Sequence, residues 1–548
     1  MISFYFHTIR YLKFKQVYWR IWFNIIKPKI YKRLIPNLRV SQNKFCLPIK
    51  KKASLLNKDT FSFLNKSQLF SKTGWDGGQL NISKLWLYNL HYFDDLNAKG
   101  SEERKIWHNE LLEEWIKVNK VGKGVGWEPY PTSLRIVNWI KWSFSGNTLS
   151  NSCKQSLLFQ ASWIDKRIEW HILGNHLFVN AKALVFAGLF FYNEQSKIWL
   201  KKGLKIINDE LDEQILDDGG NFELSPMYHA IFLEDLLDLI NISKVYPQDI
   251  KEVQINKWIK IVKKMIGWLE TMTHPDGDIS FFNDAALEIA PKLNELKKYA
   301  QRLGLDFNSN KFNKVTHLSS SGYIRLSSNN VVALLDVARI GPDYQPGHAH
   351  ADTLSFELSL FGQRLLVNGG TSEYEISEIR HYERSTKAHN TVVVDNQNSS
   401  EVWSGFRVAR RAYPFDLQIK ETDQLITISC SHDGYTRLNG KPVHRREWQF
   451  HHSSLIIKDS IIGPFSCANA YFHFHPSITI LENQNNVWNL KMSNGKECIL
   501  KVTSGEPVIK KSYYSPKFGS KINTYCLKVT LSKKENSHVE ISWSDLNE

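Results

Sequence analysis

Residues 286–338, ALEIAPKLNELKKYAQRLGLDFNSNKFNKVTHLSSSGYIRLSSNNVVALLDVA, contain the change of pattern that decides the fold. Up to residue 304 the apolar residues recur at three- and four-residue spacing, which is typical of an amphipathic helix. Within 321–338 they instead form short alternating or β-branched runs, which are typical of strands. We therefore predict a boundary between residues 305 and 318, in the polar stretch around Asn308-Ser309-Asn310.

Upstream of this boundary the helical spacing repeats between glycine and proline breakers, in 132–145, 153–170, 176–192, 197–215, 228–243, 255–272 and 286–304. Successive amphipathic helices with short links predict helical hairpins that curl into a toroid or solenoid.

Downstream of the boundary, short β-branched or aromatic segments follow one another, in 321–327, 331–338, 353–360, 364–368, 391–394, 425–431, 446–450, 454–461, 470–474, 488–492, 498–503 and 524–532. Many short strands joined by polar turns predict an antiparallel β-sandwich. The expected fold class is therefore multidomain α+β. A basic-aromatic extension at 1–60 and an (α/α) toroid at 61–312 precede the sandwich at 313–548.

The net charge of +15 is concentrated in that extension. Residues 1–58 hold 14 of the 70 Lys and Arg residues and none of the 55 Asp and Glu residues, which leaves 56 basic against 55 acidic residues elsewhere. Basic and aromatic residues alternate along the extension, a pattern that suits an interfacial helix on an anionic membrane. A solvated arm without a partner fits equally well. We expect no nucleic-acid partner, because no nucleic-acid motif accompanies the charge.

Cysteine usage and the start of the chain bear on its compartment. Six scattered cysteines without a CxxC pair favour free thiols over a disulfide framework. Basic residues interrupt every apolar run near the start, so no cleavable signal peptide is expected.

Two candidate sites lie at predicted helix starts. Gly174-Asn175-His176 opens one helix, where Asn175 is either an N-cap or a donor to an anion such as a substrate carboxylate. In the second, Ser225 and Pro226 start a helix that carries Tyr228 in its first turn. The helix dipole there favours a phenolate, although packing of Tyr228 on a neighbouring helix is the alternative.

Two further candidates lie near predicted strands. His348, His350 and Asp352 alternate before the segment 353–360, so they are expected on one side of an extended chain. Such an HxH pair suits either metal binding or acid–base chemistry. His389 precedes the predicted strand 391–394 and is either structural or a further ligand at the same place.

These motifs, in this order, resemble the heparinase II/III family over about residues 85–415, including Asn89-Leu-His-Tyr-Phe-Asp94, Gly126-Trp-Glu-Pro-Tyr-Pro-Thr-Ser-Leu-Arg135 and Trp403-Ser-Gly-Phe-Arg407. The resemblance implies a toroid followed by a β-sandwich, and a lyase that breaks an acidic, uronic-acid-containing glycan by β-elimination. By resemblance, Asn175 and His176 neutralise the uronate carboxylate, Tyr228 is the base, the acid or both, and His348 is its partner. Trp127, Tyr130, Arg135 and Glu223 are candidates for binding neighbouring sugars, with packing and ion pairs inside the toroid as the alternative.

The resemblance also implies a structural zinc ion bound by two histidines and an aspartate. His350 and His389 match the histidines, but Asn368 stands where the aspartate is expected. A neutral amide is a poor zinc ligand, so no cofactor is required, and His350 and His389 can instead hydrogen-bond Asn368. Members of the family are commonly periplasmic, whereas the basic extension indicates the cytoplasmic face of a membrane.

Two other functions remain open at the level of sequence. A glycoside hydrolase needs two facing carboxyl groups, which Glu128, Asp218 and Glu223 can supply. A non-catalytic glycan-handling protein of surface-polysaccharide synthesis would keep the fold without the chemistry.

Overall fold

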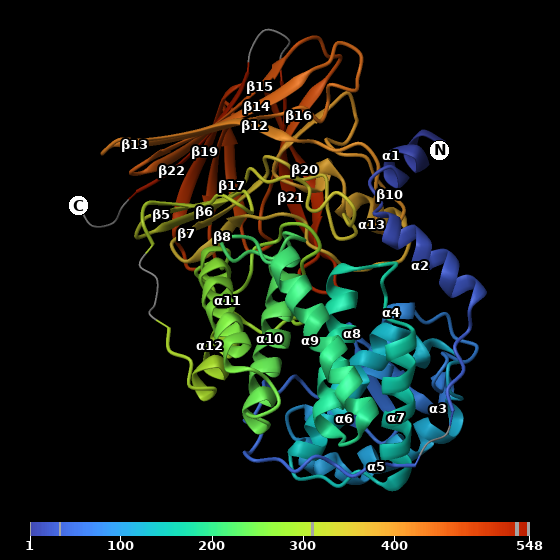
Figure 1. Cartoon of the computed structure of the whole chain (residues 1–548). Coiled ribbons are helices and arrows are strands. Elements are labelled where there is room, and N and C mark those ends of the chain that lie inside the picture. Colours follow the sequence, from blue (N-terminus) through green and yellow to red (C-terminus); the bar gives the residue numbers. More distant parts are fainter. Residues whose placement is uncertain (1, 32–33, 308–311, 532–535, 545–548) are drawn as a thin grey trace.

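The computed structural model describes residues 2–31, 34–307, 312–531 and 536–544. Figure 1 shows a helical body joined to a body of β-sheets, with the first two helices along one edge of the molecule. The helices precede the large sheets in the chain, as the change of pattern predicted. The boundary itself stays a prediction, because Asn308–Asn310 lie outside the described residues.

The helical body is made of elements with these bounds: α3 (Phe70–Thr73), α4 (Lys84–Tyr92), η1 (Asp94–Asn97), η2 (Ser101–Arg104), α5 (Lys105–Val118), η3 (Val125–Trp127), α6 (Pro129–Phe144), α7 (Asn151–Lys166), α8 (Gly174–Phe190), α9 (Glu194–Gln214), α10 (Pro226–Val245), α11 (Glu252–Thr271) and α12 (Leu293–Arg302). A small sheet of β1 (Leu55–Asn57), β2 (Thr60–Phe63) and β3 (Lys66–Leu69) lies beside them.

Helix α8 runs through the middle of this body, with nearly every residue buried. It packs closely on α9 because a Cβ atom at Gly203 would lie 2.8 Å from the carbonyl oxygen of Ala181. Six of the predicted helices lie within a few residues of their observed bounds. The seventh begins at Leu293 rather than 286, because Pro291 cannot continue a helix.

The β-body holds three larger antiparallel sheets. Their strands are β4 (Val315–Leu318), β5 (Tyr323–Ser327), β6 (Val331–Asp336), β7 (Phe356–Leu360), β8 (Gln363–Leu366), β9 (Val392–Val394), β12 (Pro414–Glu421), β13 (Leu425–His432), β14 (Val443–His451), β15 (Ser454–Ile462), β16 (Ala468–His473), β17 (Thr479–Gln484), β18 (Val487–Lys491), β19 (Glu497–Ser504), β20 (Glu506–Tyr514), β21 (Ile522–Thr530) and β22 (Ser537–Trp543). The sheet orders are β12-β13-β14-β15-β22-β19-β18-β17, β20-β21-β16-β9 and β4-β5-β6-β7-β8.

The sheet β4–β8 joins the two bodies. Along β6, Ala333 and Leu335 face the core of the β-sandwich, whereas Val332 and Leu334 belong to the core of the helical body. Both faces of β6 are therefore buried, which explains why its sequence is continuously apolar rather than alternating.

Shorter elements lie between β8 and β12 in the chain: α13 (Glu378–Glu383), η4 (Thr386–Ala388) and the hairpin of β10 (Val402–Trp403) with β11 (Arg407–Val408). At the start of the described chain lie α1 (Ile2–Ile9) and α2 (Phe14–Ile25). Within the described residues, no helix is both long enough and apolar enough to cross a bilayer. All six cysteines are free thiols, in agreement with the prediction.

Candidate active site

The first turn of α8 presents Asn175 beside a strained backbone. Leu173 and Gly174 have positive φ angles of 70° and 52°, and a Cβ atom at Gly174 would collide with the side chain of Gln345. Asn175 does not cap the helix, because Leu173 occupies the N-cap position. Its Nδ2 instead donates to the Tyr130 hydroxyl at 3.3 Å, and its buried Oδ1 has no hydrogen-bond partner among the described residues. This placement favours a binding role over a capping role.

His176 follows on the same turn and remains partly exposed. Its Nδ1 lies 3.1 Å from Glu169 Oε1, and its ring centre lies 4.5 Å from that of Tyr130. Burial acts to lower the pKa of His176, but the Glu169 carboxylate outweighs burial and leaves the pKa raised. The raised pKa favours an imidazolium, which is suited to meet a substrate carboxylate.

Tyr228 lies in the first turn of α10, as predicted from Ser225 and Pro226. The Ser225 hydroxyl accepts from the Tyr228 backbone N–H at 3.2 Å and donates to the Asp284 carbonyl at 2.6 Å. The expected phenolate is not favoured, however. Burial, followed by the nearby Tyr374 and Asp284, raises the pKa of Tyr228 well above its ordinary value. Desolvation outweighs the helix dipole at this position, so the phenol is neutral.

The Tyr228 ring stacks on His348, which comes from the β-body. The ring centres lie 3.8 Å apart with an angle of 29° between the planes. The Tyr228 hydroxyl is 3.0 Å from the Tyr374 hydroxyl, and Phe406 packs edge-on against His348. The predicted pair of Tyr228 and His348 is therefore in direct contact across the junction of the two bodies.

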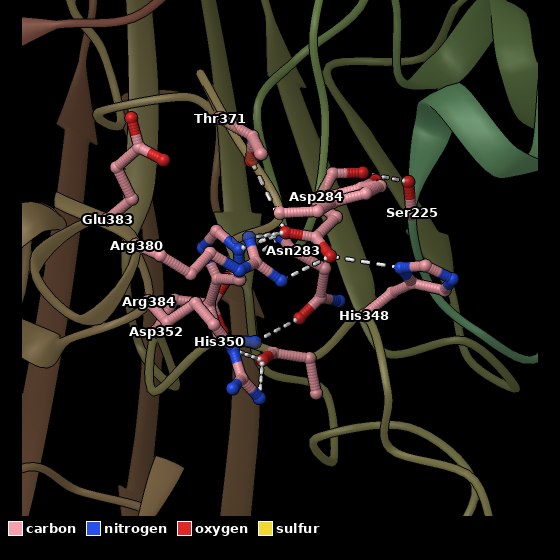
Figure 2. A network of polar contacts seen from close by, with 12 residues as sticks. Ser225, Asn283, Asp284, His348, His350, Asp352, Thr371, Arg380, Glu383 and Arg384 are labelled. Carbon is pink, nitrogen blue, oxygen red and sulfur yellow. Dashed lines mark hydrogen bonds and ion pairs between the residues drawn. The ribbon is translucent and has the colours of Figure 1, made fainter. Parts of the chain in front are cut away.

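Asp284 lies at the centre of the network drawn in Figure 2, between His348 and the side chains of His350 and Arg380. His348 Nδ1 is 2.9 Å from Asp284 Oδ2, and His350 Nε2 is 2.8 Å from Oδ1. Arg380 binds the same carboxylate through both terminal nitrogens. Burial alone would raise the pKa of Asp284, but Arg380 and the hydrogen bonds hold it well below the usual range. The ionised carboxylate therefore accepts N–H from His348 Nδ1, so that Nε2 carries the lone pair when the ring is neutral.

Glu223 lies near the Nε2 atom of His348, whereas Asp284 binds the Nδ1 atom of the same ring. Its Oε2 is buried, lacks a hydrogen-bond partner among the described residues, and lies 3.6 Å from His348 Nε2. Burial raises the pKa of Glu223, and the nearby His348 offsets only part of that shift. A buried carboxyl oxygen without a partner, next to a histidine, is a site for a polar ligand atom.

His350 and His389 lie side by side, although His348–Asp352 form a loop rather than the expected extended chain. The strand predicted at 353–360 begins only at Phe356. His350 Nδ1 is 3.1 Å from His389 Nε2. Asn368 bonds neither histidine in the described structure; its Oδ1 accepts from the Asn390 N–H at 3.2 Å. The described residues contain no group of three or more His, Cys, Asp or Glu side chains placed to hold a metal ion. The position at which the resemblance implies an aspartate is therefore an amide whose oxygen bonds the backbone and neither histidine.

Two of the predicted sugar-binding residues are corrected by burial. Arg135 is fully buried and bonds Gln160, Thr132 and the His91 carbonyl, with its guanidinium over the Trp115 ring. Trp127 is 2% exposed, and its indole N–H donates to the Asn119 carbonyl. Both side chains stabilise the interior of the helical body and cannot reach a substrate. Tyr130 and Glu223, in contrast, lie at the site.

Three residues at the site were missed from the sequence: Asp284, Arg380 and Tyr374. Asp284 follows Asn283 within an otherwise apolar run, which is a weak signal for a buried polar site. Arg380 lies four residues before Arg384, and nothing in its local pattern indicates a partner 96 residues away. Tyr374 carries no distinguishing pattern at all.

Two family models match the chain, together over most of its length. Residues 112–310 match the "Heparinase II/III N-terminus" model and residues 312–544 match the "Heparinase II/III-like, C-terminal" model.

Among curated relatives, the heparin-sulfate lyase of Bacteroides stercoris is 28% identical over 250 residues, which cover 42% of this chain and 37% of that protein. The heparin-sulfate lyase of Pedobacter heparinus is 27% identical over 253 residues, which cover 41% of this chain and 36% of that protein. The chain therefore spans well under half the length of these two relatives.

Among solved structures, heparinase III has a TM-score of 0.70 at 18% identity, over 85% of this chain and 78% of that one. The heparan sulfate lyase of Pedobacter heparinus has a TM-score of 0.57 at 18% identity, over 89% of this chain and 82% of that one. At these identities the likeness shows the fold, which agrees with the predicted toroid and β-sandwich.

Proposed function

This chain belongs to the heparinase II/III family, and we propose that it is a polysaccharide lyase that cleaves a uronic-acid-containing glycan by β-elimination. One observation carries the proposal: Tyr228 stacks on His348, and Asp284 holds the Nδ1 of that histidine. A neutral phenol and an oriented imidazole in contact are an acid–base pair of the kind that β-elimination needs.

The roles follow from the protonation states at the site. His348 Nε2 removes the proton from C5 of the uronate, because Asp284 holds the proton of the same ring on Nδ1. Tyr228 then donates its phenolic proton to the glycosidic oxygen at C4, because burial keeps that phenol protonated. The C4–O bond breaks as the C4=C5 double bond forms, so each proton and electron pair has a destination.

The substrate carboxylate becomes more negative as C5 loses its proton. Asn175 Nδ2 and the His176 imidazolium are donors placed at the start of a helix, where the dipole also favours an anion. Tyr130 bonds Asn175 and packs against His176, so it orients both donors. Glu223 contacts the next polar group of the sugar near His348.

A panel of uronic-acid polysaccharides tests the reaction, with near-ultraviolet absorbance reporting the unsaturated product. We expect at least one polymer to yield this product, and Tyr228→Phe to abolish it. Tyr525→Phe, on an exposed tyrosine of β21, is the matched control and should leave the rate unchanged. New reducing ends without absorbance would identify a hydrolase instead, and silence on every polymer would favour a glycan-handling protein.

We also propose that residues 1–60 form a separate segment that makes peripheral contact with a membrane, and that the toroid and the sandwich divide at 312/313. The basic composition of the segment and the exposed apolar side chains of α1 and α2 support the contact.

A further inference from the structure

Helices α1 and α2 form a strap across the junction of the two bodies; we use this name for residues 2–25. Gln16 of α2 donates to the Tyr344 carbonyl at 3.3 Å, and Phe23 packs under Arg167 at the end of α7. In α1, the Thr8 hydroxyl donates to the Val408 carbonyl at 3.2 Å and accepts from the Trp403 indole N–H at 3.1 Å. Helix α2 therefore contacts the helical body at Arg167 and the loop between β6 and β7 at Tyr344, and α1 contacts the β10–β11 hairpin.

The opposite face of α2 is apolar and open to solvent. Gln16 and Phe23 are its buried residues, and they lie on the side that faces the protein. On the outer side, the exposed residues recur at helical spacing: Phe14 83%, Tyr18 44%, Ile21 55%, Trp22 41% and Ile25 70%. A helix of a soluble domain normally presents polar residues on the side away from its core. Two apolar faces on one helix indicate a second apolar environment.

Helix α1 shows the same arrangement. Phe4 and Tyr5 pack against Trp403, while Ile2, Phe6 and Ile9 are exposed at spacings of four and three residues. The two helices follow one another along the edge of the molecule (Figure 1). Each helix of the strap thus exposes one set of apolar side chains to solvent.

Cations flank these apolar residues without local acidic partners. Lys13 pairs with Glu213 of α9, but within the described part of the chain Arg20, Lys27 and Lys29 have no carboxylate within ion-pair distance. An apolar stripe bordered by exposed Lys and Arg matches the boundary between headgroups and acyl chains of an anionic bilayer.

We propose that the outer face of the strap docks on an anionic lipid bilayer, with Phe14, Tyr18, Ile21, Trp22 and Ile25 inserted and Arg20, Lys27 and Lys29 among the headgroups. This inference deepens the membrane contact proposed above and rests on it. A soluble polyanion would use the cations but would leave the apolar stripe in water, so the stripe favours lipid.

Docking through this face has a consequence for the candidate active site. The β10–β11 hairpin that α1 contacts also carries Phe406 between its strands, and Phe406 packs on His348 and Tyr374. The β10–β11 hairpin would therefore lie between the strap, which binds the bilayer, and the acid–base pair, which Phe406 contacts. The enzyme would be held with its site next to the membrane, where it would meet glycan attached to or emerging from that surface.

Vesicle flotation of the full chain tests the docking, with phosphatidylcholine vesicles that contain or lack about one-third phosphatidylglycerol. We expect partition into the anionic vesicles only. Phe14→Ser with Ile25→Ser should weaken partition at least about tenfold, because two apolar side chains no longer insert. Arg20→Gln with Lys27→Gln and Lys29→Gln should weaken it on the order of 100-fold, at about fivefold for each cation.

Matched controls separate the strap from general surface properties. Ile106→Ser removes an apolar side chain that is 72% exposed on α5, and Lys117→Gln with Lys120→Gln and Lys123→Gln removes three exposed cations. Both controls should partition as the unchanged chain does. Equal partition of the Phe14/Ile25 variant, or equal binding to vesicles without phosphatidylglycerol, would overturn the proposal. The proposal would also be overturned if only the charge variant lost partition and if the chain bound soluble heparin through the same cations.

The same variants keep this proposal distinct from the proposed lyase reaction. None of the substituted residues contacts the acid–base pair, so turnover of a soluble glycan should be unchanged in all of them. Partition without turnover on any glycan would contradict only the lyase, whereas turnover without partition would contradict only the docking.

Discussion

Two buried clusters in this protein are built from the same parts. In one, Asp284 binds Arg380 and His350, and His350 bonds His389. In the other, Asp459 binds Arg446 and His444 at 2.7–2.9 Å, and His444 Nδ1 lies 3.2 Å from His432 Nε2. A carboxylate, a guanidinium and two imidazoles are therefore a structural unit that this chain uses twice.

The clusters differ in what else the aspartate holds. Asp459 accepts from the buried Ser537 hydroxyl, so that cluster is closed inside the sandwich. Asp284 instead holds His348, whose side chain is 18% exposed and stacks on Tyr228. The buried unit supplies a fixed, ionised carboxylate, and chemistry becomes available only where one more histidine leads from it to the surface.

Replacing one histidine in each cluster should give the largest difference in activity between the two clusters. His348→Gln should lower kcat by about 10²–10⁴-fold, the usual contribution of a general base. His444→Gln removes an equivalent bond to a buried aspartate but should leave kcat within about twofold. Steady-state kinetics on the glycan that the panel identifies gives the comparison, and equal losses in both variants would show that the histidines act only through stability.

Replacing each aspartate compares how much the two clusters contribute to the free energy of unfolding. Asp284→Asn and Asp459→Asn each leave a buried arginine without its counter-ion, which costs about 3–5 kcal/mol. We expect similar losses in the free energy of unfolding by urea titration. Activity per folded molecule should fall only for Asp284→Asn, and a fall of the same size in both variants would contradict the separation of the clusters.

Arg135 provides a buried arginine that belongs to neither cluster. Its partners are neutral, so Arg135→Met should cost about 2–4 kcal/mol through lost hydrogen bonds and unsatisfied carbonyl groups. KM for the glycan should be unchanged, because the side chain is fully buried. A raised KM with unchanged stability would restore the sugar-binding role first expected for Arg135.

Glu223 should show the smallest effect, and the size of this effect on the melting temperature depends on pH. Burial raises its pKa in the folded state, so its contribution to stability is full below the unfolded pKa and is lost as pH rises through the folded pKa. Glu223→Gln should therefore raise the melting temperature above that of the unchanged chain near pH 8, and the difference should shrink towards pH 4. A lower melting temperature of Glu223→Gln near pH 8, with the deficit disappearing towards pH 4, would instead show that Glu223 is held ionised.

The helical and strand segments could be predicted because each depends on a local period. Helices such as α9 and α11 bury one stripe, and strands such as β14 alternate buried and half-buried residues. Strands β12 and β20 were missed since most of their side chains are exposed, so burial imposes little alternation on their sequences.

The residues of the candidate site likewise include some that the sequence indicated and others that it could not indicate. The sequence indicated Asn175, His176, Tyr228 and His348 through helix starts, the HxH motif and a family resemblance, and the structure places Tyr228 against His348. It could not indicate that Asp284 orients His348, because the two residues are 64 positions apart and meet only when the sandwich packs on the helices.

The sequence by itself determined that a helical region precedes a region of strands, the concentration of charge in the first 58 residues and the family. The tertiary structure alone decided which polar residues are accessible: Arg135 and Trp127 are enclosed by the helical body, whereas His348 reaches the junction of the two bodies. The physical reason is that periodicity reports which side of an element is buried, but not which elements lie against that side. Long-range packing sets the surroundings of each carboxylate and imidazole, and those surroundings set its charge and its chemistry.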